Sequence, residues 1–257
     1  MVHRRHNSLV IWIILLSQLL SWSCRGDRSS RFRDLDSLKP EMLETNFDRI
    51  REEGVLEVVT DYNSISYFIY RGQPMGFQFE MLQALADHLE LDLDVSVSND
   101  LEKNFRDLNS GVVDLIAMNL TVTADRKKQF HFTSPLLQTR QVLVQRKPEH
   151  WEDMNAKQME TNVIRNQLNL AGKTVYVQSG SVYAKRLRDL SNEIGGGIRI
   201  NEVQLEAEQL IQRVALGEID YTICDENVGL VNATYFPGLD VSTAISFPQN
   251  VAWAVNL

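Results

Sequence analysis

GVVDLIAMNLTVTADRKKQFHFTSP, residues 111–135, is the stretch of sequence that decides how this chain folds. Its apolar run from Leu115 to Met118 predicts a buried strand, and a second short strand is expected at residues 130–132. Between them lies a polar corner, residues 119–123, which is followed by Arg126. Hydroxyl, amide and free backbone N–H groups beside the planar donor fork of an arginine are suited to holding a carboxylate. The alternative is a solvated arginine on an ordinary turn.

Strands and helices alternate on both sides of this stretch and form two units. The first unit is predicted to contain, in order, strand 55–60, helix 77–89, strand 91–97, helix 101–108 and strand 114–118. The second is predicted to contain strand 173–178, helix 182–190, strand 198–203, helix 205–216 and strand 221–224. Extended segments 141–145 and 251–255 are expected to cross between the units. We therefore predict an α/β protein with two lobes, mainly parallel sheets and a cleft between the lobes.

The first 24 residues are expected to be a secretory signal rather than part of the fold. Arg4 and Arg5 give it a basic start, and its apolar stretch Leu9–Leu20 is too short to span a membrane. Cys24 directly follows a small residue after that stretch, which resembles a bacterial lipoprotein signal with Cys24 as the site of lipidation. The alternative is an ordinary cleaved signal with an incidental cysteine. Residues 25–39 are polar and predict a flexible tether.

Composition restricts the classes of function. Removing Arg4 and Arg5 from the 26 basic residues leaves 24, against 34 acidic residues, and hence a formal net charge of −10. So acidic a chain argues against nucleic acid as a partner. If Cys24 carries lipid, Cys224 is left without a disulfide partner, and its apolar strand predicts a buried, unreactive thiol. The sequence has no Cys/His cluster, so neither a metal nor a cofactor is expected.

Polar side chains follow four of the predicted strands. They are Thr60, Asp61 and Tyr62, then Asn119, Thr121 and Arg126, then Ser179, Gly180 and Ser181, and finally Asp225 and Glu226. Ligands of open α/β sheets bind outside the carboxyl ends of the strands, so we expect these groups to face the cleft. Arg126 then offers a cation for a carboxylate, and Asp225 offers an anion for an ammonium group. Taken singly, each residue is more typical of a cap or a turn.

Four motifs in the same order resemble those of bacterial extracellular solute-binding proteins, family 3, the amino-acid-binding type. The motifs are Gly76–Met81; Ser110–Asp114 with Thr121–Arg126 and Phe132–Pro135; Gly172–Ser181; and Gly217–Tyr221 with Asp225. Each motif is weak alone, but together they run from about residue 53 to the end of the chain. The resemblance implies a two-lobed periplasmic-binding-protein fold of type II, with two strand crossovers, that closes on a small amino acid or a similar ligand.

The resemblance also implies a set of ligand-binding residues. The set is Asp61, Tyr62, Asn119, Thr121, Arg126, Ser181 and Asp225. Arg126 would bind the α-carboxylate, Asp225 would pair with the α-ammonium group, and Ser181 would contact the ligand from the second lobe. The aromatic residue that usually covers the ligand is replaced here by Ser64, and a second aromatic position falls near Leu101. The motifs therefore leave the ligand's identity open.

A closer resemblance is to the non-catalytic N-terminal domain of the membrane-bound lytic transglycosylase F family. It rests on the tether, on a first helix predicted at residues 40–53, on strand 55–60 and on Asp220–Ile223 with Asp225. In that family a lysozyme-like domain that cleaves peptidoglycan follows the binding module. The Glu-Ser pair of that catalytic domain is absent from this sequence. We expect the catalytic domain to be missing here and the first lobe to be incomplete at its C-terminus.

Three functional hypotheses follow. The first is a ligand-sensing module that regulates a peptidoglycan lytic transglycosylase, lipid-anchored at the periplasmic face of a bacterial membrane, expected to be the outer one. The second is a stand-alone substrate-binding lipoprotein of an amino-acid ABC importer, with a permease as partner. The third is an enzyme that uses a pocket carboxylate, Glu80 or Asp61, and it is disfavoured because no paired base is evident.

We expect residues 40–140 and 246–257 to form lobe 1, and residues 141–245 to form lobe 2.

Overall fold

A computed structural model describes residues 47–256 of the 257-residue chain. The first sheet contains β1 (Val55–Thr60), β4 (Asp92–Val97), β5 (Leu115–Thr121), β6 (His131–Phe132), β7 (Leu137–Thr139) and β13 (Gln249–Val255). The second contains β8 (Gln141–Arg146), β9 (Thr174–Gln178), β10 (Arg199–Val203), β11 (Tyr221–Asp225) and β12 (Leu239–Ala244). The described α-helices are α2 (Phe47–Glu53), α3 (Phe77–Leu89), α4 (Leu101–Asn109), α5 (Ala156–Asn162), α6 (Val182–Glu193), α7 (Ala207–Ala215) and α8 (Glu226–Tyr235).

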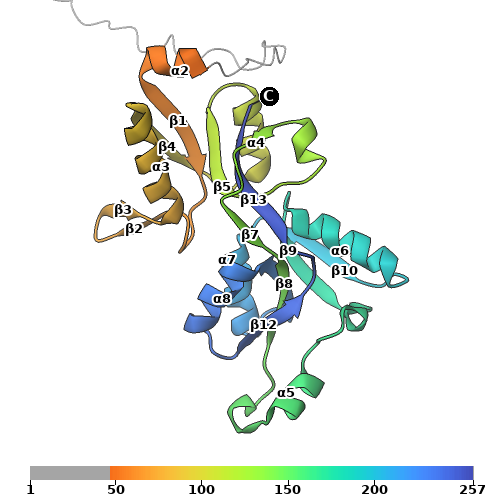
Figure 1. The fold of residues 1–257 in the computed structure, drawn as a ribbon. Helices are drawn as coiled ribbons and strands as arrows, with labels where there is room; N and C mark the ends of the chain where they lie inside the picture. The colour runs from red at the N-terminus through yellow and green to blue at the C-terminus, as the bar shows by residue number, and fades with distance from the viewer. Residues whose placement is uncertain (1–46, 257) are drawn as a thin grey trace, which may run out of the picture. The chain divides into compact units, whose positions relative to one another are not determined.

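The order of the strands explains why polar strand ends gather at one edge of each sheet. The first sheet has the order β4-β1-β5-β13-β6, with β7 also paired to β13, and the second has the order β10-β9-β11-β8-β12 (Figure 1). Strand β1 is parallel to β4 and β5, and β9 is parallel to β10 and β11. The sheets are less parallel than predicted, because β8, β12 and β13, which flank the crossings between the sheets, pair antiparallel.

Two extended crossings connect the sheets. One runs from β7 to β8, and the other returns from β12 to β13. They lie side by side, since the backbone N–H of Gln141 donates to Ser246 Oγ at 2.9 Å and Gln141 Nε2 donates to Gln249 Oε1 at 3.3 Å. The chain therefore passes twice through one narrow region, which is the natural place for the sheets to pivot.

The apolar run of β5 is buried on both faces of the first sheet. Leu115 and Ala117 pack on the side of α3, whereas Ile116 and Met118 pack on the side of α4. Successive side chains of a strand point to opposite faces, so four consecutive apolar residues fill two cores. Burial of each large side chain contributes roughly 1.5–3 kcal/mol to the free energy of folding. This packing fixes the strand that leads to the candidate site.

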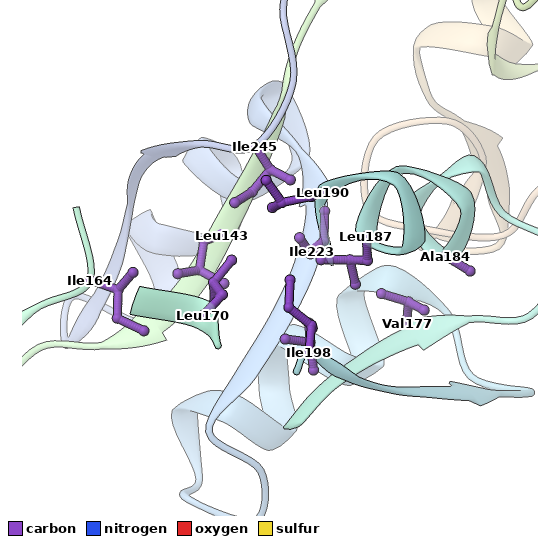
Figure 2. Packing of buried hydrophobic residues seen from close by; sticks show 11 residues of the cluster. Leu143, Ile164, Leu170, Val177, Ala184, Leu187, Leu190, Ile198, Ile223 and Ile245 are labelled. Atoms are coloured by element: carbon purple, nitrogen blue, oxygen red, sulfur yellow. The ribbon is translucent and has the colours of Figure 1, made fainter. Parts of the chain in front are cut away.

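The second sheet has a core of aliphatic side chains beneath α6. Figure 2 shows Leu143, Val177 and Ile223 from three strands close to Leu187 and Leu190 of the helix. On the other face α7 and α8 cover a second cluster, which includes Cys224. The predicted buried thiol is confirmed, because Cys224 is free and buried, and burial raises its pKa well above the usual value.

The polar corner predicted after Met118 lies partly inside a strand. Strand β5 continues to Thr121 because β13 pairs with it in antiparallel register, with Val251 opposite Thr121. Asn119 and Thr121 are therefore strand residues, and the turn comes after them. Arg126 opens a short 3-10 helix, η1 (Arg126–Lys128). The sequence pattern missed the extension because the pairing partner lies about 130 residues further along the chain.

Several predicted features lie outside the described residues. They are the signal at residues 1–24 with its lipidation site Cys24, the tether at residues 25–39, and the first part of the predicted helix 40–53. Within residues 47–256, no helix combines the length and the apolar character that a membrane crossing requires.

Candidate ligand-binding site

A cavity of about 90 Å³ is lined by residues from the ends of β1, β5, β9 and β11. Six of the seven predicted ligand-binding residues line it: Asp61, Asn119, Thr121, Arg126, Ser181 and Asp225. They come from both sheets, so the polar strand ends do meet across the space between the lobes. Leu101, at the second expected aromatic position, also lines the cavity.

Arg126 presents a largely unused set of donors to this cavity. Its Nη1 donates to the carbonyl oxygen of Thr121 at 3.1 Å, and its Cζ lies 5.2 Å from the centroid of the Phe105 ring. Burial lowers the pKa of Arg126 to about 10, which leaves the guanidinium charged at neutral pH. Among residues 47–256, Arg126 forms no salt bridge with a carboxylate. A guanidinium has five N–H donors, so most of them are available to an anion.

Asp225 supplies the opposite charge from the second lobe. It is the last residue of β11, directly before α8, and only 4% of it is exposed. Burial raises the pKa of Asp225 to about 7, although a hydrogen bond from Tyr183 and the charge of Arg126 both favour the carboxylate. The raised pKa marks a carboxylate that is short of partners for its charge. An ammonium group would be such a partner.

The remaining polar lining is held in place by hydrogen bonds. Asn119 Oδ1 accepts from Gln78 Nε2 at 2.8 Å, and Gln78 Oε1 accepts from Trp253 Nε1 at 2.5 Å. Ser181 is the N-cap residue directly before α6, and its Oγ donates to the carbonyl oxygen of Gln178 at 2.6 Å. Thr121 is buried beside them. These side chains are oriented before any ligand arrives, which reduces the cost of ordering them on binding.

Two glutamates that the sequence patterns did not single out also line the cavity. Glu206 caps the N-terminus of α7, and Glu208 lies in the first turn of that helix. Burial and the charge of Asp61 raise the pKa of Glu206 to about 7, and burial raises that of Asp61 to about 6. The only local signal was an acidic helix start after strand 198–203, and such starts are common in helices that bind nothing.

The lobes touch directly at the edge of this cavity. The backbone N–H and Oγ of Ser64 donate to the Glu208 carboxylate at 3.0 Å and 2.5 Å. Gln178 Nε2 lies 3.4 Å from the carbonyl oxygen of Asn99, and Lys185 forms a salt bridge with Asp125. Ser64, which stands where an aromatic residue was expected, therefore contributes a polar contact between the lobes.

Tyr62 is the predicted site residue that does not line the Arg126 cavity. It is 50% exposed and lies in a neighbouring groove of about 660 Å³, with Tyr235 and Phe236 of the second lobe. Glu80, one of the two carboxylates considered for catalysis, is exposed and outside the cavity, whereas Asp61 lies inside it. In the described part of the chain, no three His, Cys, Asp or Glu side chains are grouped to hold a metal ion.

Comparison with known proteins identifies relatives of two kinds. Residues 56–176 match the profile of the bacterial extracellular solute-binding proteins, family 3. The membrane-bound lytic murein transglycosylase F of Desulfosudis oleivorans is 34% identical over 210 residues, and that of Saccharophagus degradans is 31% identical over 216 residues. These alignments cover 80% and 82% of this chain but only 43% and 40% of the relatives. The chain thus spans less than half the length of the curated relatives it matches.

Solved structures establish the fold. An ancestral arginine-binding protein bound to arginine matches with a TM-score of 0.65 and 23% identity, over 79% of this chain and 84% of that one. Identity at this level supports the fold alone, and the predicted type II periplasmic-binding-protein fold is confirmed. The resemblance inferred from the motifs is confirmed as well: this chain is related to the bacterial extracellular solute-binding proteins, family 3, and to membrane-bound lytic murein transglycosylase F.

Proposed function

We propose that this chain is a ligand-sensing module of the cell envelope that closes on an amino acid or a murein peptide. One observation carries the proposal: Arg126 of the first lobe and Asp225 of the second bring opposite, buried charges to the same cavity. A zwitterion offers a carboxylate to one and an ammonium group to the other. Asn119, Thr121 and Ser181 would complete the hydrogen bonding around it.

The free-energy cost of the two buried charges favours closure of the lobes around such a ligand. Two charges removed from water and left without partners cost free energy, and Asp225 already responds by keeping its proton up to about pH 7. Charge-assisted hydrogen bonds from the ligand would offset that cost only when the lobes are closed. The ligand would therefore shift the population toward the closed form.

The role of this module in the cell is proposed from the enzymes to which it is similar. Membrane-bound lytic murein transglycosylases supply the curated matches, so we place this module as the regulatory part of such an enzyme. It would lie on the periplasmic face of a membrane, held through lipid on Cys24 and the tether at residues 25–39.

The lipid anchor is tested by labelling with palmitate in a bacterial host. We expect the wild type to incorporate labelled palmitate and Cys24→Ala not to incorporate it. Equal labelling of the two would contradict the anchor.

A second candidate function is a substrate-binding lipoprotein that delivers an amino acid to an importer. The match to solute-binding proteins favours it. The two candidate functions predict different coding sequences, because only the first requires a transglycosylase domain in the same reading frame or beside it. The downstream coding sequence separates them.

Calorimetric titration with L-amino acids and murein peptides tests the binding site. Arg126→Ala should weaken binding by about 2 kcal/mol or more, roughly 30-fold, because the ligand carboxylate is left buried without its cation. Arg199→Ala is the matched control, since Arg199 is an exposed arginine whose bonds go to Thr174 and Gly172. Equal affinity of wild type and Arg126→Ala would show that Arg126 does not bind the carboxylate.

A further inference from the structure

We propose that the cavity has a second charged subsite, formed by Asp61, Glu206 and Glu208, which receives a cationic side chain. The ligand would then be an amino acid whose side chain ends in a guanidinium or an ammonium group. This inference rests on the proposed function and narrows its ligand class. Asp61 follows β1 in the first lobe, while both glutamates begin α7 in the second. The three carboxylates therefore converge from both lobes.

Asp61 lines the cavity and keeps one unused acceptor. Its Oδ2 accepts from Asn63 Nδ2 at 2.5 Å, but its Oδ1 is closed off from solvent and has no hydrogen-bond partner. An unpaired carboxylate oxygen at such a position costs free energy, and native proteins rarely retain one without a use. A donor group from a ligand would satisfy it.

The three carboxylates also lack a positive partner. Among residues 47–256, none of them forms a salt bridge with a lysine or an arginine. Their mutual repulsion and their burial raise the pKa of Asp61 to about 6 and that of Glu206 to about 7. A cation placed among them would favour the ionised forms and lower both pKa values. A guanidinium or an ammonium group would also supply the N–H donor that Asp61 Oδ1 lacks.

The charges that act on the acidic subsite differ from those that act on Arg126. The charge that acts on Arg126 near neutral pH is that of Asp225, because burial keeps Tyr183 protonated. The charge of Glu208 acts on Asp61, and the charges of Asp61 and Glu208 act on Glu206. One cavity thus contains an arrangement for a zwitterionic head group and a separate acidic end. A ligand that fills both has a carboxylate, an ammonium group and a distal cation.

Binding at the acidic end would also act on lobe closure. Glu208 already accepts two hydrogen bonds from Ser64 of the other lobe. Gln178 donates to Glu206 at 3.0 Å and lies within 3.4 Å of Asn99 across the cleft. A cation between Asp61 and the glutamates would neutralise the repulsion that opposes this closed arrangement.

Paired ligands of nearly equal shape test the subsite in the wild-type protein. Calorimetry compares arginine with citrulline, and lysine with norleucine, so that each pair differs chiefly in the distal charge. We expect arginine and lysine to bind at least tenfold more tightly than their neutral partners. Asp61→Asn and Glu206→Gln should bring each ratio toward one. Glu149→Gln, an exposed loop glutamate, removes the same charge and should leave the ratios as in the wild type.

The outcomes separate this inference from the proposed function. If citrulline and norleucine bind as tightly as arginine and lysine, the cationic subsite is refuted while amino-acid binding stands. If none of the four amino acids nor any murein peptide gives heat, both proposals fail. Should a variant not fold, as judged by thermal unfolding, the wild-type ratios still decide the question.

Discussion

Asp225 should make the ligand-free protein less stable as the pH rises. Its carboxyl group has a pKa of about 7 in the folded protein, against an ordinary value of 3.8 for an aspartate. A folded-state pKa that is raised contributes stability below the unfolded value, and that stability is lost as the pH rises through the folded value. The window for this loss therefore runs from about pH 4 to about pH 7.

The size of the effect follows from the shift. A difference of about three pH units corresponds to roughly 4 kcal/mol between the two protonation states. Most of it, about 2–3 kcal/mol, is expected between pH 5 and pH 8, because the unfolded carboxyl group is ionised there while that of the folded protein keeps its proton until about pH 7. Asp225→Asn keeps the size of the side chain and an acceptor for the Tyr183 hydroxyl, but it cannot ionise.

Urea denaturation at pH 5 and pH 8, without ligand, is the assay. Between these values the free energy of unfolding of the wild type should fall by about 2–3 kcal/mol more than that of Asp225→Asn. Asp220→Asn is the matched control, because Asp220 lies just before the same strand with an exposed side chain paired to Arg146. If Asp225→Asn keeps the full pH dependence of the wild type, the buried carboxyl group does not titrate as described.

Two further substitutions test how the first lobe is held. Gly76→Ala would place a Cβ 2.4 Å from the carbonyl oxygen of Ser66 at a φ of +128°, so thermal unfolding should show a loss of roughly 3 kcal/mol or more. Gly72→Ala, also at positive φ but in open space, should cost only about 1 kcal/mol, and equal losses would contradict the steric reasoning. Trp253→Phe removes the donor to Gln78 Oε1 and should lower the free energy of unfolding by about 1–3 kcal/mol; an unchanged urea midpoint would argue against that hydrogen bond.

Local sequence was sufficient to predict that Arg126 and Asp225 line one cavity. Asp225 directly follows the predicted strand 221–224, and Arg126 comes a few residues after the apolar run Leu115–Met118. Strand periodicity is a short-range signal. Because parallel strands end at the same edge of a sheet, the polar groups after β1 and β5 had to be neighbours. The topology rule then made the cleft the place where the two sets meet.

The places of Glu206 and Glu208 in the cavity lining could not be found in the same way. Whether Glu206 and Glu208 face Asp61 depends on how the second lobe packs against the first, which no local pattern reports. Tyr62 differs from the other predicted residues, since it follows β1 closely yet lines the neighbouring groove. A side chain one residue further along an extended segment points to the other face, so adjacency in sequence did not ensure a place in the cavity.

The position of β13 in the first sheet has a consequence for how the protein is made. This strand lies between β5 and β6, although residues 141–244 of the second sheet are synthesised before it. On a ribosome, the five-stranded sheet has all its strands once residue 244 has emerged, whereas the six-stranded sheet waits for residue 255. Until then β5 has an open edge of the kind that invites wrong pairing. The second lobe can therefore be finished while the first, which begins earlier in the chain, is still an unclosed sheet.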